Sequence, residues 1–118
     1  MVAISDKLNE LERGLESSYK DYGRRTIQLG HTARKVSSEG GRDWYEVDVK
    51  LVGPGQFLDQ VSNVEYLLHP TFKPNVVRRD RPQLNLRLKV WGEFTIQATV
   101  HFDSGPPINL TRFLSLPG

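Results

Sequence analysis

The sequence contains no cysteine, a single methionine and no long run of apolar residues. The absence of cysteine excludes disulfides, thiolate metal ligands and cysteine redox chemistry, and it is compatible with a reducing cytoplasm. Residues 1–19 lack the uninterrupted apolar core of a signal peptide, and no later segment is long enough to span a bilayer. We therefore expect a soluble cytoplasmic protein, or a nuclear one in a eukaryote.

An excess of charge of one sign is also missing, since 16 Lys and Arg stand against 14 Asp and Glu. The formal net charge of +2 is too small to indicate a nucleic-acid partner by itself. The sequence has no serine elbow, phosphate-binding loop or cysteine nucleophile, so nothing in it supports an enzyme or a cofactor. His31 and His101 have no second histidine or carboxylate pair nearby in the sequence, and we expect no metal site.

Residues 1–25 predict an amphipathic helix that precedes a single domain over residues 26–118. Ser5 is a good N-cap, and Gly23 is a typical stop signal. Residues spaced by four and three positions form one stripe of this helix: Ile4, Leu8, Leu11, Leu15, Ser18 and Tyr22. The stripe is short for a free-standing coiled coil, so it either packs on the chain's own domain or mediates self-association.

From residue 26 onward the apolar residues recur with a period of two, which is typical of half-buried strands. We expect at least six strands, near residues 26–36, 44–51, 61–69, 84–90, 94–102 and 108–116. Many short strands without intervening helices predict an all-β fold, and about 90 residues fit an immunoglobulin-like β-sandwich. We interpret the arginine-rich segment over residues 76–82 as a solvated loop, with contact of Arg78, Arg79 and Arg81 to phosphates as the minor alternative.

Two short clusters at strand ends combine aromatic rings with hydrogen-bonding groups: His69-Pro70-Thr71-Phe72 and Trp91-Gly92-Glu93-Phe94. Pro70 ends a strand ladder, and Gly92 permits close approach of a backbone amide to a ligand, or a positive φ. Loops at one end of a sandwich are common binding sites, so the clusters are candidates for one. Alternatively, Phe72 and Phe94 plug the end of the core, and Trp91-Gly92 is an ordinary hairpin turn.

Residues 30–116 resemble a YEATS domain. Four segments follow the order and approximate spacing of that family: LGHTARK, RDWYEVDVKLVGPG, VEYLLHPTFKPNVVRRDRP and WGEFTIQATVHF. The most specific parts are the histidine-x-hydroxyl-phenylalanine group and the tryptophan-glycine-glutamate-phenylalanine turn. YEATS domains are immunoglobulin-like, non-catalytic modules that recognise acylated lysine, chiefly acetyl-lysine and crotonyl-lysine.

The resemblance implies how an acyl-lysine would bind to this chain. The acyl group would lie between Phe72 and Trp91, with Phe94 closing the slot and His69 as a further wall. The Thr71 hydroxyl and the backbone amides of Trp91 or Gly92 would bond the ligand amide. The predicted ligand-binding residues are therefore His69, Thr71, Phe72, Trp91, Gly92 and Phe94.

The chain departs from the family pattern before Trp44, where Gly40 and Gly41 stand in a segment that often supplies another aromatic wall. Its compact length and the short loop after Asp103 resemble the prokaryotic branch, in which the ligand is an acylated protein, a small acylated metabolite or a partner domain. Trp44 itself is assigned to folding. A different function also remains open, namely a structural interaction domain that assembles through the N-terminal helix and has a closed slot.

Overall fold

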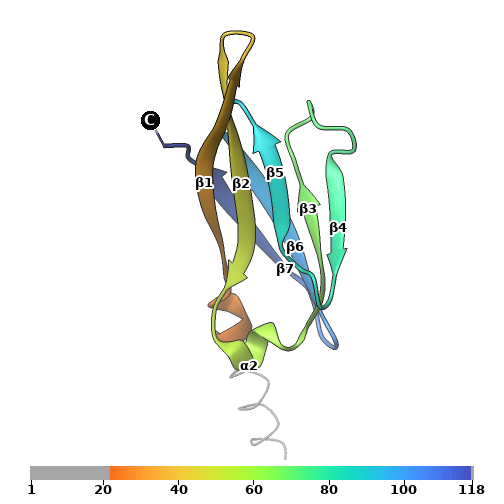
Figure 1. Ribbon diagram of the computed structural model, residues 1–118. Coiled ribbons are helices and arrows are strands. Elements are labelled where there is room, and N and C mark those ends of the chain that lie inside the picture. The colour runs from red at the N-terminus through yellow and green to blue at the C-terminus, as the bar shows by residue number, and fades with distance from the viewer. Residues whose placement is uncertain (1–21, 118) are drawn as a thin grey trace, which may run out of the picture.

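The computed structural model describes residues 22–117, which form two antiparallel sheets packed face to face (Figure 1). The three-stranded sheet has the order β1-β2-β5, with β1 (Gln28–Glu39), β2 (Arg42–Val52) and β5 (Leu86–Val90). The four-stranded sheet has the order β4-β3-β6-β7, with β4 (Val76–Asp80), β3 (Val61–Leu67), β6 (Phe94–Phe102) and β7 (Ile108–Leu114). The predicted all-β, immunoglobulin-like sandwich is confirmed.

The core lies between the sheets and follows the alternation of the sequence. In β2, Val47 and Val49 are buried while Lys50 is exposed, and β6 buries Ile96 and Val100 in the same way. Successive side chains of a strand point to opposite faces, so one apolar residue in two is enough to build this layer. The strand pattern thus determines which residues face out, including those at the sandwich ends.

One predicted loop is a strand. Residues 76–80 form β4, which pairs with β3 from Asn63↔Asp80 to Leu67↔Val76. Within β4, Val77 and Arg79 are half-buried, whereas the outward side chains are exposed. The solvated-loop interpretation of this segment was therefore wrong.

Most of the helix predicted over residues 1–25 lies outside the residues that the structure describes. The part that is described, residues 22–25, is helical. No helix in the part of the chain that the structure describes is both long and apolar enough to cross a membrane. The short helix α2 (Gly55–Leu58) connects β2 to β3 at one end of the sandwich. The β1–β2 hairpin, the β3–β4 loop and the β5–β6 turn lie at the opposite end (Figure 1).

Arg24 fastens the end that carries α2. Its guanidinium is buried, donates to Gln60 Oε1 at 2.7 Å and to the Ser104 carbonyl at 2.9 Å, and stacks on Phe102 at 4.3 Å. These contacts join the segment before β1 to the α2–β3 and β6–β7 connections. A buried cation is tolerated here because its donors are paired and its plane lies on a ring.

Candidate functional site

The fold brings the two aromatic clusters together at one end of the sandwich. The His69–Phe72 cluster follows β3, which belongs to the four-stranded sheet. The Trp91–Phe94 cluster leads from β5 in the three-stranded sheet to β6 in the other. The turn over residues 91–93 therefore crosses between the sheets, and its interpretation as an ordinary hairpin turn was wrong.

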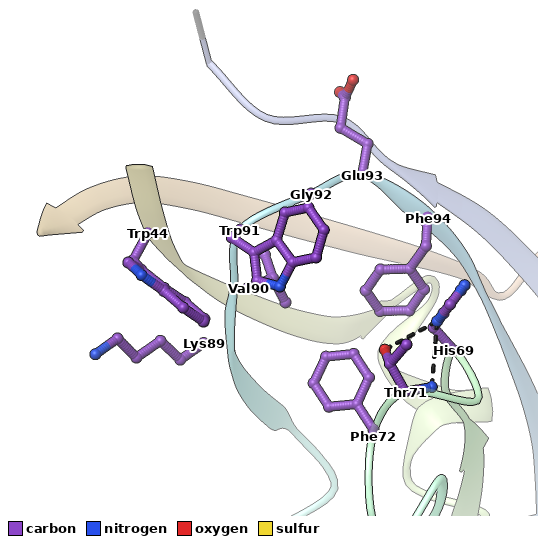
Figure 2. Close-up of a pocket in the computed structure, with 10 residues that line it drawn as sticks. All are labelled: Trp44, His69, Thr71, Phe72, Lys89, Val90, Trp91, Gly92, Glu93 and Phe94. Atoms are coloured by element: carbon purple, nitrogen blue, oxygen red, sulfur yellow. Dashed lines mark hydrogen bonds between the residues drawn. The ribbon is translucent and has the colours of Figure 1, made fainter. Parts of the chain in front are cut away.

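A pocket of about 410 Å³ lies between the two clusters (Figure 2). All six predicted ligand-binding residues line it, namely His69, Thr71, Phe72, Trp91, Gly92 and Phe94. Sequence reasoning did not assign four further lining residues to the site: Trp44, Lys89, Val90 and Glu93. The walls are mainly aromatic, and the polar groups are few, as in many sites for small ligands.

The aromatic side chains form two walls. Phe72 and Phe94 lie in tilted contact, with ring centroids 5.5 Å apart, and the His69 ring meets Phe94 edge-on at 6.2 Å. Trp91 lies across the pocket from Phe72 and Phe94 (Figure 2). Both phenylalanines also pack against the core, so their interpretation as end plugs holds in part. Anchoring in the core holds these rings in place and leaves one face of the wall toward the pocket.

His69 and Thr71 form a local hydrogen-bonded unit. The backbone N–H of Thr71 donates to His69 Nδ1 at 3.2 Å, and the Thr71 hydroxyl oxygen lies 2.9 Å from the same atom. Because Nδ1 accepts the backbone N–H, the ring proton of the neutral imidazole resides on Nε2. The hydroxyl then donates to Nδ1, and its own lone pairs are left to accept a donor from a ligand.

Gly92 contributes space. It has no positive φ, and a Cβ at this position would meet no atom within 4 Å apart from those of its neighbours Trp91 and Glu93. The close approach of the Gly92 backbone to a ligand stays a prediction. The alternative reason for a glycine here, a positive φ, does not apply. Since Gly92 lines the pocket, any added side chain would take up room beside Trp91.

Trp44 was assigned to folding, but its half-buried ring lines the pocket. In β2, Val47 and Val49 face the core, so Trp44 at the opposite parity lies on the outer face. The Lys89 ammonium lies 5.4 Å from the centre of the Trp44 ring. The sequence could have indicated this position of Trp44, because its alternation placed Trp44 among the solvent-facing residues of the strand.

The segment before Trp44 supplies a cation instead of an aromatic wall. Gly40 and Gly41 adopt positive φ values of 60° and 76° and form the tip of the β1–β2 hairpin. Such values are easily accessible only to glycine. The next residue, Arg42, places its guanidinium 4.0 Å from the centre of the Trp91 ring. This is a cation–π contact.

A second hollow of about 520 Å³ is also lined by Trp91, together with Arg42, Asp43 and the segment that follows β7. The Leu116 N–H donates to Glu93 Oε2 at 2.8 Å, and the Tyr45 hydroxyl donates to the Pro117 carbonyl at 3.1 Å. The first bond ties the chain after β7 to the turn that carries Trp91, and the second ties it to β2.

The other polar candidates do not converge on the pocket. His31 contacts the Ser115 carbonyl at 3.0 Å, and His101 Nε2 lies 3.0 Å from Glu65 Oε1. Within residues 22–117, no three His, Cys, Asp or Glu side chains are placed to hold a metal ion.

Asp43, which lines the second hollow, is anionic at neutral pH, because the Ser38 hydroxyl and the Lys35 ammonium lower the pKa of its carboxyl group.

Comparison with known proteins gives a family. The profile of the prokaryotic YEATS domain matches residues 45–115, which is more than half of the chain. No curated protein sequence matches significantly.

Solved structures of Yaf9 share the fold. The crystal structure of the yeast AF-9 homolog Yaf9 superposes with a TM-score of 0.66 at 23% identity, covering 78% of this chain and 67% of the other. The Yaf9 YEATS domain bound to H3K27ac gives 0.65 at 25% identity, covering 78% and 71%. The Yaf9 YEATS domain recognising an H3K122suc peptide gives 0.63 at 25% identity, covering 76% and 70%.

Proposed function

Because the chain belongs to the prokaryotic YEATS domain family, we propose that it is a non-catalytic module that binds an acylated lysine, or a related acyl amide, in the aromatic pocket. One observation carries the proposal: the hydrogen-bonded His69–Thr71 unit and two aromatic walls surround the same space. Yaf9 domains with this fold are bound to acylated H3 peptides, which supports an acyl ligand here.

The chemistry of the ligand suits the walls. Acylation removes the ammonium charge of lysine and leaves a planar amide, which stacks between Phe72 and Trp91 without the cost of desolvating a cation. The nearby cations Arg42 and Lys89 disfavour an unmodified ammonium further. A flat unsaturated group such as crotonyl stacks better than a saturated chain of the same length.

The amide of the ligand needs one acceptor and one donor. The Thr71 hydroxyl is the acceptor for its N–H, since that hydroxyl already donates to His69 and has lone pairs free. The backbone N–H of Trp91 or Gly92 is the donor to its carbonyl. Both groups are fixed by the loops, so little ordering is needed on binding.

A hydroxyl beside an imidazole also occurs in hydrolases, where a third group orients the imidazole. Among the described residues, nothing bonds Nε2 of His69, and the Glu93 carboxylate is bonded to the Leu116 N–H. The pocket also offers no pair of carboxylates. These features favour recognition over catalysis.

Two-dimensional NMR with the labelled full chain tests the proposal. Acetyl-lysine and crotonyl-lysine peptides should give saturable shifts at residues 69–72 and 91–94, and the unmodified peptide should give none. Trp91→Ala should abolish the shifts, whereas Phe113→Ala should not, although the two side chains are similarly exposed at 52% and 56%. Absence of shifts for every acylated peptide at millimolar concentration would overturn the proposal.

A further inference from the structure

Each tryptophan of the pocket carries a cation on its ring. Arg42 covers Trp91 at 4.0 Å, and Lys89 lies 5.4 Å from the centre of Trp44. Both cationic side chains are exposed. Lys89 on β5 lines the pocket, and Arg42 on the neighbouring strand β2 lines the second hollow, which shares Trp91, Gly92 and Glu93 with it. Two positive charges therefore stand beside the aromatic walls of the site.

The carboxylate opposite Lys89 on the neighbouring strand forms salt bridges with other residues. Glu46 is the cross-strand partner of Lys89. Its carboxylate instead lies 2.9 Å from Arg34 and 3.6 Å from Arg87. Within the described part of the chain, the Lys89 ammonium has no ion pair.

The acidic groups near Arg42 are engaged as well. Asp43 lies 3.2 Å from Lys35 and accepts from Ser38, and Glu93 accepts the Leu116 N–H. Arg42 makes no ion pair with any residue between 22 and 117. Arg42 and Lys89 thus have no salt-bridge partner in the described part of the chain, and Glu93 is the carboxylate that lines both hollows beside them.

The position of the guanidinium adds directionality. The Arg42 guanidinium lies over the Trp91 ring, and its fork of N–H donors matches the two oxygens of a carboxylate. The indole also holds the side chain in place, so less conformational entropy is lost when an anion binds. A carboxylate is therefore the group that Arg42 and Lys89 fit best.

We propose that the natural ligand carries a carboxylate beside its acyl amide, held by Arg42 and Lys89. The proposal rests on the acyl-amide function and specifies its ligand. The carboxylate has two possible sources with the same chemistry: an acidic residue next to the acylated lysine, or an acyl chain that itself ends in a carboxylate.

Calorimetric titration of the full chain with four peptides separates these sources. The probes are acetyl-lysine peptides with neutral, acidic or basic flanks, and a succinyl-lysine peptide with neutral flanks. We expect the acidic acetyl-lysine peptide or the succinyl-lysine peptide to bind roughly ten-fold more tightly than the neutral acetyl-lysine peptide, from two partly exposed charge contacts. The advantage should shrink as salt is raised.

The double variant Arg42→Gln/Lys89→Gln should remove this advantage, so that the acidic, succinylated and neutral peptides bind to that variant with equal affinity. The matched control is Arg25→Gln/Lys50→Gln, which changes the net charge equally at exposed positions that do not line the pocket. This control should retain the advantage.

The outcomes separate the two proposals. Equal binding of neutral, acidic and succinylated peptides, or an advantage that survives in the Arg42/Lys89 variant, overturns the carboxylate proposal and leaves the acyl-amide function standing. Failure of every acylated peptide to bind overturns both.

Discussion

The Thr71 hydroxyl oxygen lies 2.9 Å from Nδ1 of His69, and the Thr71 backbone N–H donates to the same atom at 3.2 Å. Two donors from one residue thus converge on one ring nitrogen. The arrangement closes a local turn in which the Phe72 N–H also donates to the His69 carbonyl at 3.0 Å. Thr71 is therefore held in position before any ligand arrives.

Replacing Thr71 by valine removes the hydroxyl and keeps the shape of the side chain. Binding of an acetyl-lysine peptide should weaken roughly ten-fold, because the ligand N–H loses its acceptor. Thr71→Ser keeps the hydroxyl and should bind within about three-fold of the original chain. Calorimetry measures both, and equal affinity of the valine variant would contradict the role assigned to Thr71.

Gly92→Ala should separate binding from folding. The added methyl group meets no atom within 4 Å beyond its two chain neighbours and no positive φ is involved, so the melting temperature should change by no more than about 2 °C. The methyl group enters the space beside Trp91, so affinity for an acetyl-lysine peptide should fall. Gly55→Ala is the control, since its Cβ also meets nothing and lies outside the pocket. Comparable peptide affinity in both variants would count against the pocket as the binding site.

Arg24→Ala should destabilise the fold by about 2–4 kcal/mol, because it leaves Gln60 and the Ser104 carbonyl without their donor and uncovers Phe102. Arg25→Ala, at the exposed neighbouring position, should change stability by no more than about 0.5 kcal/mol. Urea unfolding followed by tryptophan fluorescence gives both values. If the two variants unfold at the same urea concentration, Arg24 does not hold this end of the sandwich.

Tyr66 makes stability sensitive to alkaline pH. Burial raises the pKa of its phenol to about 12 from the ordinary value of 10.0, and its hydroxyl donates to the Leu84 carbonyl at 2.7 Å. The unfolded chain releases this proton near pH 10 while the folded chain retains it. The contribution of Tyr66 is therefore full below pH 10, and up to about 3 kcal/mol is lost as the pH rises to about 12.

Tyr66→Phe checks this linkage. The variant should be less stable by about 1 kcal/mol at pH 8, because the Leu84 carbonyl loses its donor. Between pH 10 and pH 12 the free energy of unfolding of the original chain should fall relative to that of the variant, because the variant has no phenol to ionise at this position. Urea unfolding at several pH values measures the difference. A constant difference across this range would show that Tyr66 does not couple folding to pH.

Much of the fold was readable because strands alternate with a period of two. The segment predicted over residues 94–102 is strand β6 with the same bounds. The strand β4 was missed because it is five residues long, ends in three charged residues and pairs only with β3. An edge strand of this kind buries too few apolar side chains for its sequence to be distinguished from that of a solvated loop.

The site was predictable only in part. The residues at two strand ends indicated the clusters around Phe72 and Trp91, the family resemblance gave the roles of their side chains, and the structure places both clusters at one pocket. Trp44 was missed, because the contact between the outer face of β2 and the pocket depends on how β2 pairs with β5. The contact between Arg42 and Trp91 could not be predicted from the sequence either, since it depends on where the β1–β2 hairpin tip lies in space. Periodicity gives the face of a sheet on which a side chain lies, and tertiary structure decides what it meets there.

The walls of the pocket belong to different layers of the sandwich. Phe72 lies on a loop between two strands of the four-stranded sheet, whereas Trp91 directly follows the last residue of β5 in the three-stranded sheet. A ligand stacked between them would therefore link the two sheets at this end. Pulling the sheets apart there would require breaking the ligand contacts first. Occupancy of the pocket would then register as a higher mechanical unfolding force, even if neither sheet changed its shape.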